Sequence, residues 1–331
     1  MNKKTMLIAE IGSVHDGSFG NARKIIELAN TCGADAVKFQ THIAVAESLP
    51  GAPSPSYFSN ESRINYFKRT GFTVQQWYEL KELADSIGII FMSSPFSIEA
   101  ADILESIDMS VYKIPSGEIT NIPLLERIAT FKKPVLLSSG MSNWVELDSA
   151  VSVFKDKCDL TVMQCSSVYP CPPEKIGLNI LQEIQQRYGC AVGFSDHSLG
   201  LAAPIAAAAL GASVIEKHFT FSKFMYGSDA QHSMEPDEFR ILASELKDAW
   251  MMFKSPVNKD DVSDYLTMKD IFQKSIISAI PLPAGTTIER HHLSFKKPGT
   301  GIPASEYKKL LGKTIKFDSA AEELLKMEWF E

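Results

Sequence analysis

Eight short hydrophobic runs recur along the first two thirds of the chain, and nearly every run ends in a polar or ionisable residue. The runs cover residues 5–12, 34–40, 88–94, 109–118, 133–140, 159–167, 190–197 and 212–218. Hydrophobic runs of this length are typical of parallel strands that are buried on both faces. Because the parallel strands of a barrel all end on the same side, the polar residues would gather on one rim.

The segments between these runs carry hydrophobic residues at helical spacing. In residues 74–87, for example, Trp77, Leu80, Ala84 and Ile87 fall on one helical face. The predicted helices cover residues 21–32, 74–87, 98–106, 122–130, 144–154, 178–188, 199–210 and 236–253. Eight alternations of strand and helix favour an α/β fold, a closed (β/α)₈ TIM barrel.

An open doubly wound sheet stays possible as the alternative. The first turn, residues 10–20, lacks the GxGxxG pattern that the dinucleotide-binding form of that sheet requires. A long insertion, residues 42–73, follows the second run and is rich in Pro, Ser and Asn. It predicts either a lid over the rim or a loop without a function.

The helical pattern ends near Phe253, and the sequence divides there. We expect a TIM-barrel domain over residues 1–254, a polar linker over 255–272 and a small β-rich domain over 273–331. So small a domain makes a weak hydrophobic core by itself. It would therefore lean on the barrel or on a second subunit.

Composition narrows the class of protein. A net charge of −7 with scattered Lys and Arg gives no basic stripe, which argues against a nucleic-acid partner. The first residues lack the form of a secretory signal, and no hydrophobic run approaches membrane-spanning length, so we expect a cytoplasmic protein. The five cysteines have no CxxC spacing and are expected to be free thiols.

Cationic and hydroxyl side chains end several of the runs. They are Lys38, Lys113, Ser116, Ser138 and Ser195. Two ammonium groups with hydroxyl and backbone N–H donors can bind a ligand that carries both a phosphate and a carboxylate. Each of these residues by itself is more often a surface residue or a cap, so the prediction rests on their occurring together on one rim.

Two histidines, His197 and His218, end the seventh and eighth runs, which are neighbours around a barrel. Two imidazoles on adjacent strands can hold a divalent ion and leave positions open for substrate. The alternative is a pair of hydrogen-bonded core histidines. We expect Asp196 to orient the ring of His197 and Glu216 to be structural.

The other histidines have no such placement. His42 and His232 are expected on the rim, and His15, His291 and His292 on the surface. Carboxylates that share the rim are Glu10, Glu118 and Asp229.

Motifs along the chain carry a resemblance to a known family. They are AEIG (9–12), VKFQTH (37–42), SSPF (93–96), YKIPSGE (112–118), LLSSGM (136–141), VYPCP (168–172), GFSDHSLG (193–200) and EKHFT (216–220). Together they resemble the sialic acid synthase family, or N-acetylneuraminate synthases, which includes legionaminic and pseudaminic acid synthases. The tail, with PAGTTI and FKKPGTGI, resembles the antifreeze-like (SAF) domain of that family.

The resemblance implies a condensation of phosphoenolpyruvate with an open-chain N-acetylhexosamine, which releases phosphate and gives a nine-carbon 2-keto acid. It implies that Mn²⁺ or Mg²⁺ polarises the sugar aldehyde. The implied roles are phosphoenolpyruvate binding for Lys38, Lys113, Ser116, Ser138 and Ser195, metal binding for His197 and His218, and sugar binding with proton transfer for Glu10, Glu118, Tyr169 and Asp229. It further implies a domain-swapped homodimer, in which Lys297 reaches the sugar in the partner's site.

The chain departs from the family pattern at three positions. Val14 stands where the family has Asn, Ser167 where it has Asn, and Lys297 where it has Arg. Lysine keeps the charge of arginine but loses its planar fork. A modified hexosamine or another aldose is therefore open beside N-acetylmannosamine.

Two other functions stay open at this point. One is a Schiff-base aldolase that uses Lys113 at the end of its strand. The other is a catalytically degenerate barrel that serves as a binding component in surface-polysaccharide production, suggested by the same three departures.

Overall fold

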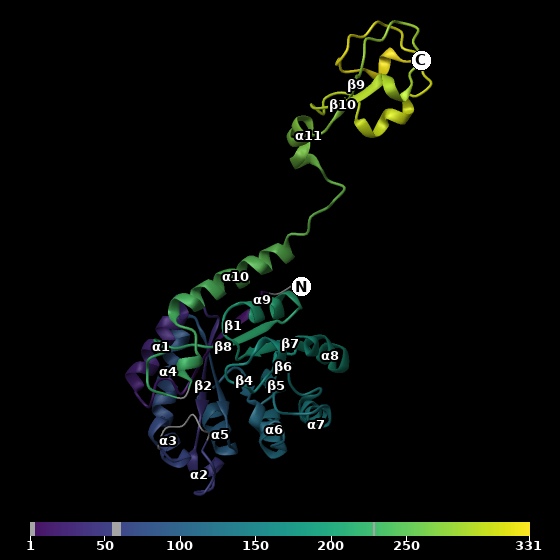
Figure 1. Cartoon of the computed structure of the whole chain (residues 1–331). Helices are drawn as coiled ribbons and strands as arrows, with labels where there is room; N and C mark the ends of the chain where they lie inside the picture. Colours follow the sequence, from purple (N-terminus) through teal and green to yellow (C-terminus); the bar gives the residue numbers. More distant parts are fainter. Residues whose placement is uncertain (1–3, 55–60, 228) are drawn as a thin grey trace. The chain divides into compact units, whose positions relative to one another are not determined.

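The computed structural model describes residues 4–54, 61–227 and 229–331, so residues 55–60 of the predicted insertion lie outside it (Figure 1). The chain forms two compact units, Met1–Ser255 and Pro256–Glu331. Each unit has its own hydrophobic core.

The first unit is a closed barrel of eight parallel strands in sequential order. The strands are β1 Met6–Gly12, β2 Ala36–Thr41, β3 Ile90–Pro95, β4 Tyr112–Ile114, β5 Val135–Ser138, β6 Leu160–Cys165, β7 Ala191–Asp196 and β8 Val214–His218. Strand β8 pairs with β1 and closes the sheet. The predicted TIM barrel is confirmed, and the open sheet is excluded.

Helices surround the barrel, as Figure 1 shows. They are α1 Phe19–Thr31, α4 Val74–Ile87, α5 Ile98–Ser106, α6 Ile122–Ala129, α7 Trp144–Phe154, α8 Asn179–Tyr188, α9 Ala202–Ala209 and α10 Pro236–Lys254, with 3₁₀ turns η1 Ser116–Glu118, η2 Pro173–Lys175 and η3 Ala230–His232. In α4, Thr73 and Gln76 form a capping box at the start, and Gly88 ends the helix in a left-handed conformation. Its buried face, which includes Trp77 and Leu80, is the face that the sequence predicts.

The insertion after β2 forms helices α2 Ala44–Glu47 and α3 Arg63–Thr70 within its described parts. Ser62 caps α3 by accepting a hydrogen bond from the backbone N–H of Asn65. Ala44, Tyr66 and Phe67 form a small hydrophobic cluster, which packs the two helices together.

Alternation along the strands divides the barrel interior into a hydrophobic floor and a polar rim. Side chains two positions apart on a strand point to the same face. The floor consists of Ile8, Ala36, Met92, Leu136, Met163 and Val214. Two residues after each of them on the same strand come Glu10, Lys38, Ser94, Ser138, Cys165 and Glu216. The polar and charged side chains of the barrel therefore lie directly above the hydrophobic floor.

The second unit is built from short elements. They are η4 Ser263–Tyr265, α11 Leu266–Phe272, β9 Ser275–Ser278, η5 Arg290–His292, β10 Leu293–Lys296, η6 Ala304–Lys309 and η7 Met327–Trp329. Strands β9 and β10 pair in antiparallel register over a core that includes Ile276, Leu310 and Phe330. Residues 255–272, which the sequence predicts to be a linker, contain α11.

Within the described ranges, none of the helices combines the length and the apolar character that crossing a bilayer requires.

His15 corrects one expectation from the sequence. It is predicted at the surface but is 2% exposed, with its ring 4.6 Å from that of Phe72 and 5.8 Å from that of Phe39. Its Nδ1 accepts a hydrogen bond from the backbone N–H of Gly17 at 3.1 Å. Burial, helped by His42, lowers the pKa of His15 to about 3. The ring is therefore neutral in the folded protein.

This burial predicts a dependence of stability on pH. The unfolded chain takes up a proton at His15 near pH 6.5, whereas the folded chain does not until about pH 3. Stability is therefore lost as the pH falls below 6.5, and at pH 5 the cost from this group is about 2 kcal/mol. Between pH 7 and pH 5, the free energy of unfolding of His15→Leu should fall by about 2 kcal/mol less than that of the unaltered protein, as measured by urea unfolding.

His291→Leu, at a histidine whose side chain is 63% exposed, serves as the control for the loss of an imidazole outside the core. Parallel pH curves for His15→Leu and the unaltered protein would contradict the assignment.

Candidate active site

A cavity of about 600 Å³ lies at the carboxyl ends of the barrel strands. The site residues predicted from the sequence that line it are Glu10, Lys38, Lys113, Ser116, Ser138, Tyr169, Ser195, His197, His218 and Asp229. These residues come from strands and loops far apart in the sequence, and closure of the barrel brings them together. Their individual roles stay predictions.

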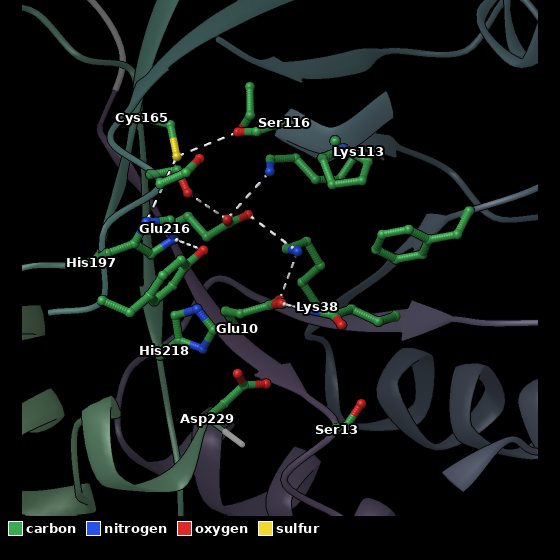
Figure 2. Close-up of a pocket in the computed structure, with 18 of the residues that line it drawn as sticks. Glu10, Ser13, Lys38, Lys113, Ser116, Cys165, His197, Glu216, His218 and Asp229 are labelled. Carbon is green, nitrogen blue, oxygen red and sulfur yellow. Dashed lines mark hydrogen bonds and ion pairs between the residues drawn. The ribbon is translucent and has the colours of Figure 1, made fainter. Parts of the chain in front are cut away.

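Glu216 lies at the centre of the charged groups in the cavity (Figure 2). Its Oε1 is 3.3 Å from Lys113 Nζ, its Oε2 is 3.7 Å from Lys38 Nζ, and Ser195 Oγ donates to Oε1 at 2.8 Å. The sequence interpretation missed this role. Alternation along β8 could have found it, because Glu216 and His218 are two residues apart and share a face.

A second carboxylate, Glu10, also pairs with Lys38. Its Oε2 is 2.8 Å from Lys38 Nζ, and Gln40 Nε2 donates to its Oε1 at 2.8 Å. Burial raises the pKa of Glu10 above its usual range, although Lys38 opposes the shift. Burial also acts to raise the pKa of Glu216, but Lys113 and Lys38 lower it by more, so this carboxylate stays ionised. Glu216 is therefore the ionised carboxylate between the two ammonium groups, and Glu10 is a second, less acidic carboxyl beside Lys38.

The positive charge of Lys113 is compensated differently from that of Lys38. Of the carboxylates in the described ranges, only that of Glu216 lies within 4 Å of Lys113 Nζ. Burial lowers the pKa of Lys113, whereas Glu216 opposes that shift. The charge of Lys113 thus depends on a single carboxylate.

Hydroxyl groups line the wall beside these charges. Ser138 Oγ is buried and has no hydrogen-bond partner in the part of the chain that the structure describes. Ser116 Oγ donates to Cys165 Sγ at 3.6 Å. A buried hydroxyl without a partner is unfavourable, so Ser138 suits a wall that hydrogen-bonds a ligand.

The two histidines of the predicted metal site are neighbours, with ring centroids 5.5 Å apart. His197 Nδ1 donates to the backbone carbonyl of Ser166 at 2.8 Å, which leaves the lone pair on Nε2, 3.0 Å from the hydroxyl of Tyr169. His218 Nδ1 is buried and has no partner among the described residues. Burial lowers the pKa of His218 to about 4, so its ring is neutral.

Neutral imidazoles with an available lone pair are good ligands for a divalent ion, so this pair fits one. Burial acts to lower the pKa of His197, but Cys165 and the Ser166 carbonyl raise it by more, so a metal would compete with a proton there. No group of three His, Cys, Asp or Glu side chains that could hold a metal occurs within residues 4–54, 61–227 and 229–331. The two imidazoles would therefore supply part of a coordination shell.

The predicted partner of His197 is wrong. Asp196 does not orient its ring but pairs with Lys217, at 2.5 Å from Oδ2 to Nζ. Asp196 points away from the cavity because it is adjacent to two inward-facing residues, Ser195 and His197. The carbonyl of Ser166 takes the place expected for the carboxylate.

Helix α3 of the insertion supplies part of the cavity wall, which the sequence interpretation left open. Arg63 and Phe67 line the cavity, as do the predicted rim residues His42 and His232. The ring of His42 is stacked between Phe67 at 3.6 Å and Phe96 at 4.0 Å. Arg63 had no signal in the sequence, because the insertion has no strand or barrel pattern to place it.

Glu118 is not among the lining residues. It follows β4 in η1, and its Oε2 accepts a hydrogen bond from Asn121 Nδ2 at 2.7 Å. Lys297 lies in the second unit, where its Nζ is 4.8 Å from the ring centroid of Phe272. Both roles rest on the resemblance alone.

Comparison with known proteins identifies the family. Residues 25–258 match the NeuB family. The chain belongs to the NeuB family. It is 34% identical to N,N'-diacetyllegionaminic acid synthase of Campylobacter jejuni, over 98% of this chain and 99% of that protein. It is 30% identical to pseudaminic acid synthase of the same species, over 100% of this chain and 98% of that protein.

A solved structure agrees with this assignment. N-acetylneuraminic acid (sialic acid) synthetase of Leptospira borgpetersenii, in complex with citrate, matches with a TM-score of 0.72 and 30% identity. The match covers 81% of this chain and 91% of that one. The resemblance to sialic acid synthases is therefore confirmed.

Two departures from the NeuB family pattern fall in the barrel. Val14 is fully buried in the hydrophobic core, so the missing amide is replaced by apolar packing. Ser167 lines the cavity. Its hydroxyl lies near Gly140, where a Cβ would come within 2.6 Å of Ser167 Oγ and of Ser116 Oγ.

The charge network predicts a non-additive effect on stability. Glu216→Gln leaves Lys113 buried without its carboxylate, so we expect a loss of about 3 kcal/mol in the free energy of unfolding at pH 7. Adding Lys113→Met removes the unpaired charge. The double variant is therefore expected to be more stable than Glu216→Gln alone, as measured by urea unfolding.

Asp85→Asn, which breaks an exposed ion pair with Lys81, is the control and is expected to change stability by less than about 0.5 kcal/mol. Simple addition of the two single effects would show that Lys113 does not depend on Glu216.

Proposed function

We propose that this chain condenses phosphoenolpyruvate with the open-chain aldehyde of an N-acylated hexosamine, releasing phosphate and forming a nine-carbon 2-keto acid. The observation that carries this proposal is the meeting of two lysines, three serines and two histidines in one cavity. Membership of the NeuB family and relatives named as legionaminic and pseudaminic acid synthases support it.

Phosphoenolpyruvate would bind at the inner end of the cavity. Lys38 and Lys113 supply positive charge, and Ser116, Ser138 and Ser195 supply hydroxyl donors. The buried hydroxyl of Ser138, which has no partner among the described residues, supports this placement. Because the site is largely removed from water, each anionic group of the ligand needs such a donor close to it.

His197 and His218 would hold a divalent ion, Mn²⁺ or Mg²⁺. Such an ion, when bound, acts as a Lewis acid toward the aldehyde oxygen of the sugar. The neutral ring of His218 and the tautomer of His197, set by the carbonyl of Ser166, support the pair as ligands.

The chain's own carboxylates and one phenol would handle the protons. Carbon 3 of phosphoenolpyruvate forms the new bond to the aldehyde carbon, the aldehyde oxygen takes up a proton, and water adds at carbon 2 before the phosphate leaves. Glu10 is suited to these transfers, because burial moves its pKa toward neutrality. Tyr169 and Asp229 lie in the same wall and would bind the sugar. Glu118 is assigned a part in sugar binding by the resemblance alone.

The second unit would be an SAF domain. In this proposal two copies of the chain form a domain-swapped dimer, and Lys297 of one copy reaches the sugar bound by the other. The small core of the unit, formed by few buried residues, supports a need for a partner surface. The free state of all five cysteines suits the reducing cytoplasm, where we place the enzyme.

Phosphate release from phosphoenolpyruvate with a panel of hexosamines tests the function. We expect release only when both substrates are present. Lys113→Met should lower kcat/KM by roughly 100-fold, because it removes a charged donor to an anion. Lys133→Met, at a lysine that pairs with Glu105 and Asp108 outside the cavity, is the matched control and should leave the rate unchanged.

A chelator and borohydride separate the proposal from a Schiff-base aldolase. The lowered pKa of Lys113 is the one observation that favours the aldolase. The proposal expects loss of activity with a chelator, recovery with Mn²⁺ and no trapped adduct. A covalent adduct at Lys113 after borohydride would replace the proposal, and failure with every sugar despite bound metal would favour a binding protein.

The lysine in the tail is expected to affect sugar choice. Lys297→Arg restores a planar fork that can make paired hydrogen bonds to an acyl amide. We expect it to raise kcat/KM for N-acetylmannosamine by about tenfold relative to the unaltered enzyme, measured by phosphate release. Lys296→Arg, at the neighbouring lysine that pairs with Glu322, is the control. Equal effects of the two substitutions, or a fully active monomer in sedimentation, would refute the role of Lys297.

A further inference from the structure

We propose that Lys217 is a positioning residue, which clamps both neighbours of His197 to strand β8 and so sets the spacing of the two imidazoles. The proposal rests on the proposed function in one respect, namely that His197 and His218 bind a divalent ion. It assigns a role to a buried ion pair on the outer face of the barrel sheet.

The register of β7 and β8 places the Asp196–Lys217 ion pair one residue before the two histidines on their strands. Asp196 and Lys217 are paired across the two strands, and they are the last pair of that ladder. Each is followed by one of the histidines, His197 and His218. Since side chains alternate, the ion pair lies on the outer face and the imidazoles on the inner face.

The ammonium group of Lys217 holds the residues on both sides of His197. It is 2.5 Å from Asp196 Oδ2 and donates to the backbone carbonyl of Ser198. The backbone N–H of Ser198 in turn donates to Asp196 Oδ1 at 2.8 Å. One side chain of β8 therefore fixes the chain before and after His197.

His197 needs such a support because it lies beyond the end of β7, which stops at Asp196. On its other side, its Nδ1 contacts the Ser166 carbonyl and its backbone carbonyl accepts from the N–H of Cys171 at 2.8 Å. These contacts tie His197 to the segment after β6. The Lys217 clamp ties the chain on both sides of His197 to the strand that carries His218, in addition to the ladder that ends at Asp196.

The deep burial of the Lys217–Asp196 ion pair indicates that the pair fixes local geometry rather than adding to the stability of the fold. The side chains of Lys217 and Asp196 are 2% and 1% exposed. Removing both charges from water costs several kcal/mol per ion, and a well-packed apolar pair of similar size would stabilise the fold as well or better. An apolar pair has no fixed direction, whereas these hydrogen bonds fix both length and angle.

The consequence concerns the metal rather than the fold. The ring centroids are 5.5 Å apart, and a metal requires its ligands within about 0.2 Å of the ideal distance. Loss of a contact that orients a ligand typically lowers metal affinity by 10- to 100-fold. A loosened His197 should therefore weaken binding of the ion before it unfolds the barrel.

The test is Mn²⁺ affinity of the full-length double variant Lys217→Met/Asp196→Asn. Asparagine can still accept the hydrogen bond from Ser198, and no unpaired charge is left, so the variant is expected to fold. Mn²⁺ binding is followed by the loss of the free-ion signal in electron paramagnetic resonance. We expect affinity at least about tenfold weaker than in the unaltered protein. The visible absorption of bound Co²⁺, which reports ligand geometry, should change as well.

The matched control is Lys4→Met/Asp35→Asn. Lys4 and Asp35 also form an ion pair between two strand ends of the barrel, with 2.6 Å from Nζ to Oδ1. Asp35 also accepts a hydrogen bond from a backbone N–H, that of Leu7. It lies at the amino ends of the strands, so Mn²⁺ affinity should not change. Equal affinity of the Lys217 double variant and the unaltered protein, or an equal loss in both double variants, would overturn the positioning role alone. A lack of Mn²⁺ binding by the unaltered protein would overturn the metal assignment together with it.

Discussion

The burial of two lysines inside one barrel is the constraint on which the site depends. Removing each ammonium group from water costs several kcal/mol, and two such groups facing the same cavity also repel each other. The carboxylate of Glu216 pairs with both ammonium groups, and Glu10 gives Lys38 a second carboxyl partner. The carboxylates make it possible to hold the lysines in place inside the barrel, so that the geometry of the two ammonium groups is already formed.

The same alternation that builds the barrel builds this network. Hydrophobic residues such as Ile8 and Val214 fill the floor, and Glu10 and Glu216 follow them two positions later on the same face. Packing of the floor therefore fixes the height and direction of the charged residues. On the outer face of the sheet, the proposed Lys217 clamp holds the chain around His197, which lies beyond the last pair of the β7–β8 ladder.

Much of this was accessible from the sequence, because the signals were local. Buried parallel strands require unbroken hydrophobic runs, and the polar residues that end the runs gather on one rim, so the fold and many of the cavity residues could be predicted. The pairing of charges could not. Glu216 contacts Lys38 and Lys113 only after the barrel closes, and Lys217 finds its partner Asp196 only when β7 and β8 are paired.

Burial that comes from distant segments was equally hidden. His15 lies in a short polar turn and is covered by Phe72, which is far along the chain. Arg63 reaches the cavity through an insertion that has no periodic pattern. In both positions the decisive neighbour belongs to another part of the sequence.

The sealed floor has a consequence for the order in which ligands come and go. Ile8, Ala36, Met92 and Met163 are fully buried, so nothing can reach the cavity from the amino ends of the strands. Molecules that react within the barrel must share the entrance at the rim. If Lys38 and Lys113 hold phosphoenolpyruvate as proposed, that ligand lies nearest the floor, so it must enter before the sugar, and whatever remains beside the two lysines after turnover must leave last.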